Sequence, residues 1–142
     1  MTGSGDRRRI LAIDPGERRV GLAVSDPLGI TAQGLPTLDR RRDGDVVGRV
    51  RALLAEYDVE RIVVGYPLAL SGRETEASRL ASAMAEELRA AFGLPVDLWD
   101  ERLSSAEAER TLRGARAEKG AVDRLAAVLI LQGYLDARRP AQ

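Results

Sequence analysis

ILAIDPGERRVGLAV, residues 10–24, consists of two apolar runs separated by a short polar turn. The first run, 10–13, is apolar at every position, which is typical of a short strand buried on both faces. It ends at Asp14-Pro15-Gly16, a turn signal, and the second run, 20–24, follows within a few residues. This spacing predicts two neighbouring strands that pair as a hairpin.

The rest of the chain alternates strand-like and helix-like segments. Further strands are predicted at 30–38, 61–67 and 95–99, and helices at 46–57, 77–91, 104–113 and 122–135. Asp43 is expected to cap the first of these helices. The order β-β-β-α-β-α-β-α-α begins as a meander and continues with parallel crossovers. We therefore predict an α/β fold with a mixed five-stranded sheet flanked by helices.

Length and charge fit one domain without a strongly basic surface. The chain has 142 residues, and its 22 basic and 22 acidic side chains give a formal net charge of zero. Residues 1–9 are expected to form a flexible basic leader and residues 10–138 a single domain. Any nucleic-acid site should be a local patch, because the whole chain is not basic. Arg40, Arg41 and Arg42 are interpreted as solvated surface that is also able to meet phosphate.

The sequence contains no cysteine and no histidine. Disulfides, thiolate zinc sites, cysteine nucleophiles and histidine bases are therefore excluded within this chain. An enzyme built from it must rely on carboxylates, hydroxyls, amides, arginines and its single lysine, Lys119. Carboxylates are the oxygen ligands that Mg²⁺ and Mn²⁺ prefer, so catalysis assisted by one of these ions is the leading enzyme class.

No apolar run approaches the roughly 18 to 20 residues that a membrane span needs, and the start of the chain lacks a secretory core. We expect a cytoplasmic protein with no membrane contact.

Three acidic positions are candidates for a site. Asp14 ends the first strand, where open α/β sheets bind ligands, although a turn-forming Asp before Pro-Gly is common. Asp100 and Glu101 follow the last strand, and strand alternation alone cannot choose between them. Asp123 lies in the first turn of a nearly all-apolar helix, where a carboxylate needs a cap role, an arginine or a metal.

Three stretches in this order resemble the YqgF family of pre-16S rRNA nucleases and Holliday junction resolvases. The matching motifs are Asp14 to Asp26, Asp100-Glu101-Arg102-Leu103-Ser104-Ser105, and Lys119 to Asp123 with Ala126-Ala127. The resemblance implies a ribonuclease H-like fold and a Mg²⁺ or Mn²⁺ site in which Asp14, Glu101 and Asp123 are the catalytic and metal-binding acids. Nucleic-acid-binding positions are expected at Arg18, Arg19, Arg102, Ser104 and Lys119.

The sequence departs from the family pattern in the middle of the chain. Leu68-Ala69-Leu70 stands where the family commonly has an Asn, and Tyr66 where a smaller apolar residue is usual. Better-known junction resolvases also place an acid near the end of this strand, whereas Gly65-Tyr66-Pro67 offers none.

The resemblance implies metal-dependent phosphodiester hydrolysis, with 5′-end processing of pre-16S rRNA as the leading role. A two-metal version would place the ions about 3.5 to 4 Å apart with Asp14 touching both, and a one-metal version remains open. One alternative is cleavage of four-way DNA junctions, which requires paired incisions and hence a homodimer. Another is a non-catalytic nucleic-acid-binding ribosome assembly factor. An actin-like phosphate-binding module is disfavoured because such proteins usually need two domains.

Overall fold

The structure, a computed structural model, describes residues 9–101 and 119–138; for residues 119–123 the side chains lie outside the described part. The chain begins with a meander of three strands, β1 (Arg9–Asp14), β2 (Arg19–Ser25) and β3 (Ala32–Asp39). β1 and β2 pair antiparallel with Leu11 opposite Val24, and β2 continues antiparallel to β3. The hairpin predicted from residues 10–24 is therefore confirmed.

Two crossover units complete the sheet. Helix α1 (Val46–Tyr57) leads to β4 (Val59–Tyr66), and α2 (Glu76–Phe92) leads to β5 (Val96–Asp100). β4 pairs parallel to β1, and β5 pairs parallel to β4, which gives the strand order β3-β2-β1-β4-β5. The predicted mixed five-stranded sheet is confirmed. The predicted helix at 104–113 lies outside the described residues.

The N-cap of α1 differs from the prediction. Asp45, not Asp43, caps the helix, and its Oδ1 accepts a hydrogen bond from the backbone N–H of Gly48 at 2.7 Å. The carboxylate of Asp43 is instead engaged by the backbone N–H of Asp39 and by the side chain of Arg42. A carboxylate committed to the preceding turn cannot also accept from the first turn of the helix, so the cap role falls to the next acid.

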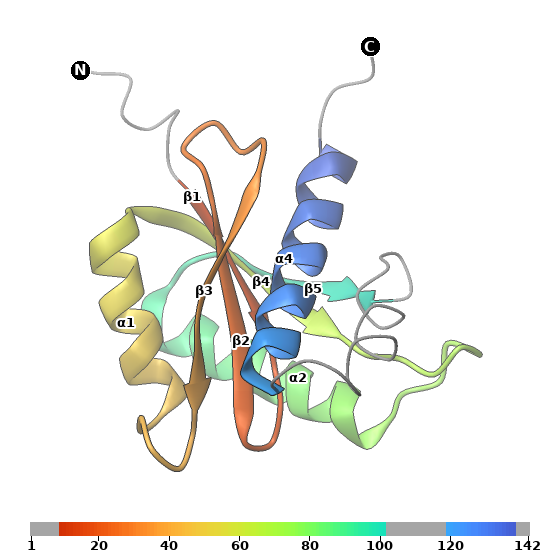
Figure 1. Ribbon diagram of the computed structural model, residues 1–142. Coiled ribbons are helices and arrows are strands. Elements are labelled where there is room, and N and C mark those ends of the chain that lie inside the picture. Colours follow the sequence, from red (N-terminus) through yellow and green to blue (C-terminus); the bar gives the residue numbers. More distant parts are fainter. Residues whose placement is uncertain (1–8, 102–118, 139–142) are drawn as a thin grey trace.

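Helices cover both faces of the sheet (Figure 1). Helices α1 and α2 lie against one face, where Leu11 and Ile13 of β1 join a core of mostly large aliphatic side chains. The other face carries α4 (Lys119–Arg138) alone among the described helices. Ile10 and Ala12 of β1 point to that side and pack with its helix. Alternate residues of one strand therefore serve two separate cores.

The core under α4 combines alanines with larger side chains such as Ile130, Leu131 and Tyr134. Ala12 and Ala23 of the sheet meet Ala126 and Ala127 of the helix, and all four are buried to within 1% exposure. Small side chains allow the helix axis to approach the sheet closely. No described helix is long and apolar enough to cross a membrane.

Candidate active site

Asp14 is the last residue of β1 and is only 5% exposed. Ile10 and Ala12 face α4, so strand alternation places the Asp14 side chain on the same face. The turn that follows is tight, because a Cβ added at Gly16 would lie 2.3 Å from the backbone oxygen of Arg19. Only glycine permits that approach, and the compact turn holds Asp14 at the carboxyl end of the strand.

Glu101 directly follows β5 and is 2% exposed. Its carboxylate lies over β4: a Cβ added at Gly65 would stand 3.0 Å from Oε2 of Glu101 and 2.8 Å from Cδ1 of Ile130. Because Ile130 belongs to α4, Glu101 also lies on the α4 face of the sheet. Asp100, the alternative left open by the sequence, is only partly buried at the end of β5.

The strand register brings Asp14 and Glu101 toward each other. β1 and β4 pair with Ala12 beside Val63 and Ile13 beside Val64. Continuing this register by one residue places Asp14 beside Gly65, the residue over which the Glu101 carboxylate lies. Neighbouring strands are about 4.8 Å apart, so the two acids occupy adjacent positions on one face. Glu101 thus reaches back across β4 toward β1 instead of remaining over its own strand.

Asp123, the third predicted acid, lies in α4, but its side chain is outside the described residues. Ala126 and Ala127, which follow it by about one turn, are buried against the sheet. The side chain of Lys119, like Arg102 and Ser104, also lies outside the described part. Within that part no group of three or more acidic side chains could hold a metal ion, so the described portion of the site consists of two carboxylates.

These residues fit a hard divalent cation. Both are buried carboxylates, and their oxygens are the donors that Mg²⁺ and Mn²⁺ prefer. Two acids buried on one face repel each other unless a positive charge or hydrogen bonds compensate them. The missing side chain at Gly65 leaves the space that the Glu101 carboxylate occupies. The role of Gly65 in making room for Glu101 was not predicted from the sequence, although a glycine inside a strand is a known sign that another group approaches the backbone closely.

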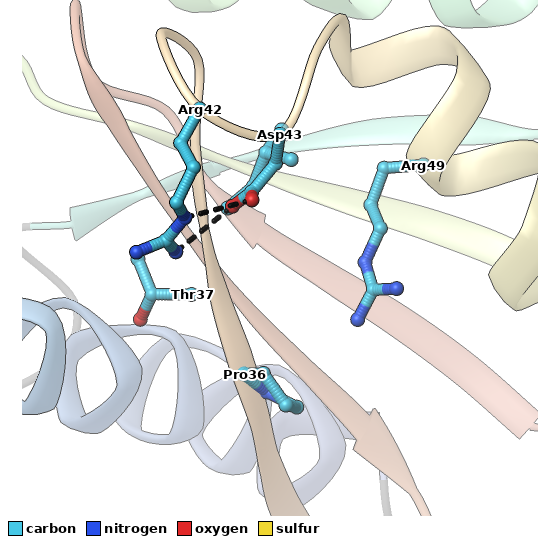
Figure 2. Close-up of a pocket in the computed structure, with 6 residues that line it drawn as sticks. Pro36, Thr37, Arg42, Asp43 and Arg49 are labelled. Atoms are coloured by element: carbon cyan, nitrogen blue, oxygen red, sulfur yellow. Dashed lines mark hydrogen bonds and ion pairs between the residues drawn. The ribbon is translucent and has the colours of Figure 1, made fainter.

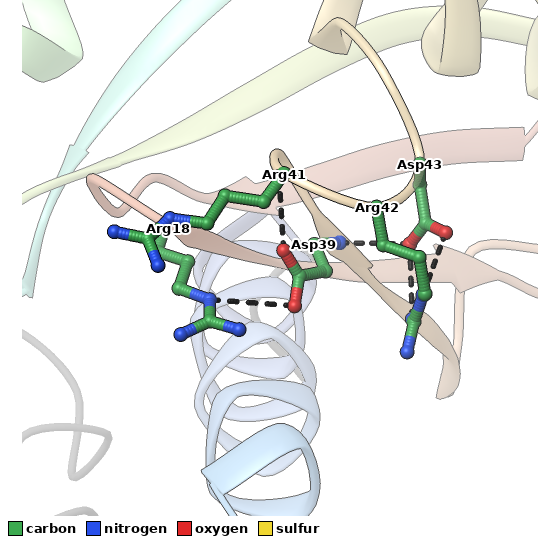
Figure 3. A network of polar contacts seen from close by, with 5 residues as sticks. All are labelled: Arg18, Asp39, Arg41, Arg42 and Asp43. Atoms are coloured by element: carbon green, nitrogen blue, oxygen red, sulfur yellow. Dashed lines mark hydrogen bonds and ion pairs between the residues drawn. The ribbon is translucent and has the colours of Figure 1, made fainter.

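Arginines surround the same end of the sheet on the β2–β3 side (Figure 3). Nε of Arg18 lies 3.4 Å from Oδ2 of Asp39, and Nε of Arg40 donates to the backbone oxygen of Gly16 at 3.0 Å. Arg19 begins β2 opposite Asp39. The backbone N–H of Arg41 and the Arg18 guanidinium lower the pKa of Asp39, while burial opposes the shift.

A described cavity of about 330 Å³ lies in the neighbouring part of the molecule and is lined by Pro36, Thr37, Leu38, Arg42, Asp43 and Arg49. Figure 2 shows the paired Arg42 and Asp43 beside it and the Arg49 side chain opposite. Neither Asp14 nor Glu101 lines this cavity. The two buried acids therefore lie outside this cavity.

Arg124 of α4 is another basic residue that sequence reasoning did not single out. Its Nε donates to the backbone oxygen of Leu35 at 3.1 Å. Its aliphatic stem crosses β3 at Gly34, where an added Cβ would lie 2.5 Å from Cγ of Arg124. The glycine thus lets α4 anchor to the edge strand, a contact that no local sequence pattern reveals.

Comparison with known proteins gives one family. The family model described as "RuvX: Holliday junction resolvase" matches residues 8–137. A protein of Koribacter versatilis named "Putative pre-16S rRNA nuclease" is 50% identical over 134 residues, which cover 92% of this chain and 88% of its own length. A protein of the same name from Listeria monocytogenes is 46% identical and covers 90% of this chain and 97% of its own length.

A solved structure supports the same fold. Thermus thermophilus RuvC in complex with a Holliday junction substrate superposes with a TM-score of 0.57 at 22% identity, covering 92% of this chain and 95% of that chain. At this identity the likeness shows the fold alone, and it confirms the ribonuclease H-like architecture that the sequence predicted.

Proposed function

The chain belongs to the RuvX family of Holliday junction resolvases and is a nuclease, and we propose that it hydrolyses phosphodiester bonds with Mg²⁺ or Mn²⁺ held by Asp14, Glu101 and Asp123. The observation that carries this proposal is the adjacency of two buried carboxylates, Asp14 on β1 and Glu101 over β4, at the carboxyl end of parallel strands. Open α/β sheets bind their ligands at this end.

The ion and the three acids have distinct roles in the proposed reaction. A bound divalent ion supplies Lewis acidity and makes water a better nucleophile at neutral pH. Asp14 is central because it lies at the end of the middle strand. Glu101 follows β5, and we propose that Asp123, which belongs to α4, completes the site. Three carboxylates suffice for one ion and are few for two, so the number of ions stays open.

Basic residues would hold the substrate phosphates. Arg18 and Arg19 follow Asp14 in the turn and at the start of β2. Arg102, Ser104 and Lys119 are proposed for the same task from their motif positions. A guanidinium group donates two parallel hydrogen bonds to the oxygens of one phosphate. Such contacts position the nucleic-acid backbone without reading the base sequence.

We propose 5′-end processing of pre-16S rRNA, in the cytoplasm, as the natural role. Relatives that carry this name are 46 to 50% identical over nearly the whole chain, which supports it. Junction cleavage is the second candidate, because the family description names it. That reaction needs two incisions related by symmetry and thus predicts a two-fold dimer.

Cleavage by the purified protein tests the proposal. A 5′-extended 16S rRNA precursor and a synthetic four-way DNA junction are each incubated with Mg²⁺, Mn²⁺ or a chelator. Asp14→Asn removes the central carboxylate, and Asp26→Asn is the matched control, because Asp26 only accepts backbone hydrogen bonds in the β2–β3 loop. We expect metal-dependent cleavage that Asp14→Asn abolishes and Asp26→Asn retains.

Which of the two substrates is cut distinguishes pre-16S rRNA processing from junction cleavage. Cleavage that persists in chelator, or in Asp14→Asn, would contradict the metal site. Absence of cleavage of both substrates, with binding retained by both variants, would instead indicate the non-catalytic assembly factor.

A further inference from the structure

Three consecutive arginines, Arg40 to Arg42, occupy three different environments, and Figure 3 shows the last two of them. Arg40 is a structural link, because its backbone N–H donates to the oxygen of Arg18 at 2.8 Å and its Nε to the oxygen of Gly16 at 3.0 Å. Arg42 is committed to Asp43 through Nε at 2.9 Å and Nη2 at 3.1 Å. Both guanidinium groups therefore already bind a neighbour within the fold.

Arg41 differs from both of its neighbours. Its backbone N–H donates to Oδ1 of Asp39 at 2.9 Å, which fixes its main chain in the turn after β3. Its side chain is exposed, and no residue in the described part of the chain forms an ion pair or hydrogen bond with its guanidinium. Arg18 is a comparable group. Its Nε lies 3.4 Å from Oδ2 of Asp39, and its side chain remains 47% exposed.

The surroundings carry an excess of positive charge although the whole chain is neutral. Residues 17–19 and 39–43, which we call the arginine corner, contain five arginines and three acids. Arg18 and Arg41 extend to the same side of Asp39 in Figure 3. Oδ2 of Asp39 pairs with the Arg18 guanidinium and Oδ1 accepts the backbone N–H of Arg41, so the Arg41 guanidinium has no paired carboxylate in the described part of the corner.

The arginine corner lies at the same end of the sheet as Asp14. β1 ends there, β2 begins there, and β3 ends there at Asp39. The hydrogen bond from Arg40 to Gly16 ties the corner directly to the turn after Asp14. Two strand spacings separate β3 from β1, roughly 10 Å. A strand bound with its cleaved bond at Asp14 would therefore place a phosphate a few nucleotides away at the corner.

We infer that Arg41, with Arg18 beside it, binds a backbone phosphate of the nucleic acid a few nucleotides from the bond that is cut, whereas the guanidinium groups of Arg40 and Arg42 already bind neighbours within the fold. This inference rests on the proposed function only in that the cut lies at Asp14. Guanidinium and phosphate form charge-assisted, two-pronged hydrogen bonds. Such a contact is independent of sequence and is shared by RNA and DNA.

Salt-dependent binding tests the inference without any cleavage. Affinities for a 5′-extended 16S precursor RNA and for a four-way DNA junction are measured by fluorescence anisotropy in chelator, over a series of salt concentrations. Arg41→Ala is compared with Arg42→Ala, the matched control next to it. Arg41→Lys retains the charge without the two-pronged geometry.

We expect Arg41→Ala to weaken binding about tenfold, as for loss of one hydrogen-bonded charge. The slope of log K against log salt should shrink by about 0.9 on the duplex junction and about 0.7 on single-stranded RNA. Arg42→Ala should change affinity less than twofold and leave the slope unchanged, and Arg41→Lys should keep the wild-type slope.

Equal effects of Arg41→Ala and Arg42→Ala would overturn the assignment, as would an unchanged slope in Arg41→Ala. A change with only one of the two nucleic acids would overturn the claim that a phosphate common to both is bound. Wild-type protein that binds neither would overturn the inference together with the nucleic-acid role. A slope change in Arg41→Ala in a protein that cuts nothing would uphold the inference while the proposed function fails.

Discussion

The two faces of the sheet use the same strands for different purposes. The face under α1 and α2 buries large aliphatic side chains such as Leu53 and Leu88. The face under α4 buries alanines beside larger side chains such as Ile130 and Leu131, and it also buries Glu101 over Gly65. Large side chains fill a core efficiently, whereas small ones leave room for a carboxylate between sheet and helix. Both faces therefore bury apolar side chains, and the buried acids of the described residues, Asp14 and Glu101, lie on the α4 face.

Removal of the central acid should give the largest effect and should be confined to activity. Asp14→Asn preserves shape but weakens ion binding, and a metal ion supplies several kcal/mol of transition-state stabilisation. We expect cleavage to fall about 10³-fold. The melting temperature should change little, because Asn fills the same space as Asp. Initial cleavage rates measure the activity, and thermal unfolding measures the stability. A large loss of stability in Asp14→Asn would show that Asp14 also supports the fold.

Truncation of a large side chain on the face under α1 and α2 should lower stability and leave activity unchanged. Leu88 is fully buried on α2, so Leu88→Ala should lower the free energy of unfolding by about 2 to 5 kcal/mol. The cleavage rate per folded molecule, measured well below the melting temperature, should remain within twofold of wild type. A loss of cleavage comparable to that of Asp14→Asn would show that the two faces are not independent.

Gly65 offers a sharper test within the α4 face. An added Cβ would meet both Glu101 and Cδ1 of Ile130, so Gly65→Ala alone also strains the helix contact. The double variant Gly65→Ala/Ile130→Val removes Cδ1 and leaves only the conflict with the carboxylate. We expect Mn²⁺ affinity to fall about tenfold in the double variant, the size typical of disturbed ligand support.

Gly34→Ala is the matched control for this experiment. Its Cβ would meet Arg124 and Val128 of the same helix, over β3, whereas Glu101 lies over Gly65 of β4. Calorimetry with Mn²⁺ should give wild-type affinity for Gly34→Ala even where its melting temperature falls. An unchanged Mn²⁺ affinity in the double variant would show that Gly65 does not support the metal site.

The smallest effect concerns the surface pair of Arg42 and Asp43. Hydrogen bonds from Arg42 and from the backbone lower the pKa of Asp43 to about 2. A lowered pKa means that the pair contributes fully above the ordinary value near 3.8 and that its contribution is lost as the pH falls through about 2. An NMR titration of the Asp43 carboxyl should give a pKa near 2, rising toward 3.8 in Arg42→Ala. An ordinary pKa in the wild type would show that Arg42 is not committed to Asp43.

Local patterns in the sequence were enough to predict the order of elements and the place of Asp14. Apolar runs define strands, and a Pro-Gly turn marks the end of the first strand, so both follow from short stretches of chain. The cap of α1 was misplaced by two residues, because Asp43 and Asp45 are both suitable acids and only the turn geometry distinguishes them.

Contacts between distant segments could not be predicted in the same way. The choice between Asp100 and Glu101 depends on how the chain leaves β5, where strand alternation ends. The closeness of Glu101 to Gly65 depends on the register of β4, and that of Arg124 to Gly34 on the docking of α4. Asp123 remains a prediction from its motif.

Direct measurement of ion binding tests the central claim that Asp14 and Glu101 form one metal site. Mn²⁺ is titrated by calorimetry into the wild type, Glu101→Gln and Asp100→Asn, two neutral replacements at neighbouring positions. The account predicts binding by the wild type, at least tenfold weaker binding by Glu101→Gln, and affinity within twofold of wild type for Asp100→Asn. Loss of binding in Asp100→Asn with retention in Glu101→Gln, or a wild type that binds no Mn²⁺, would contradict it.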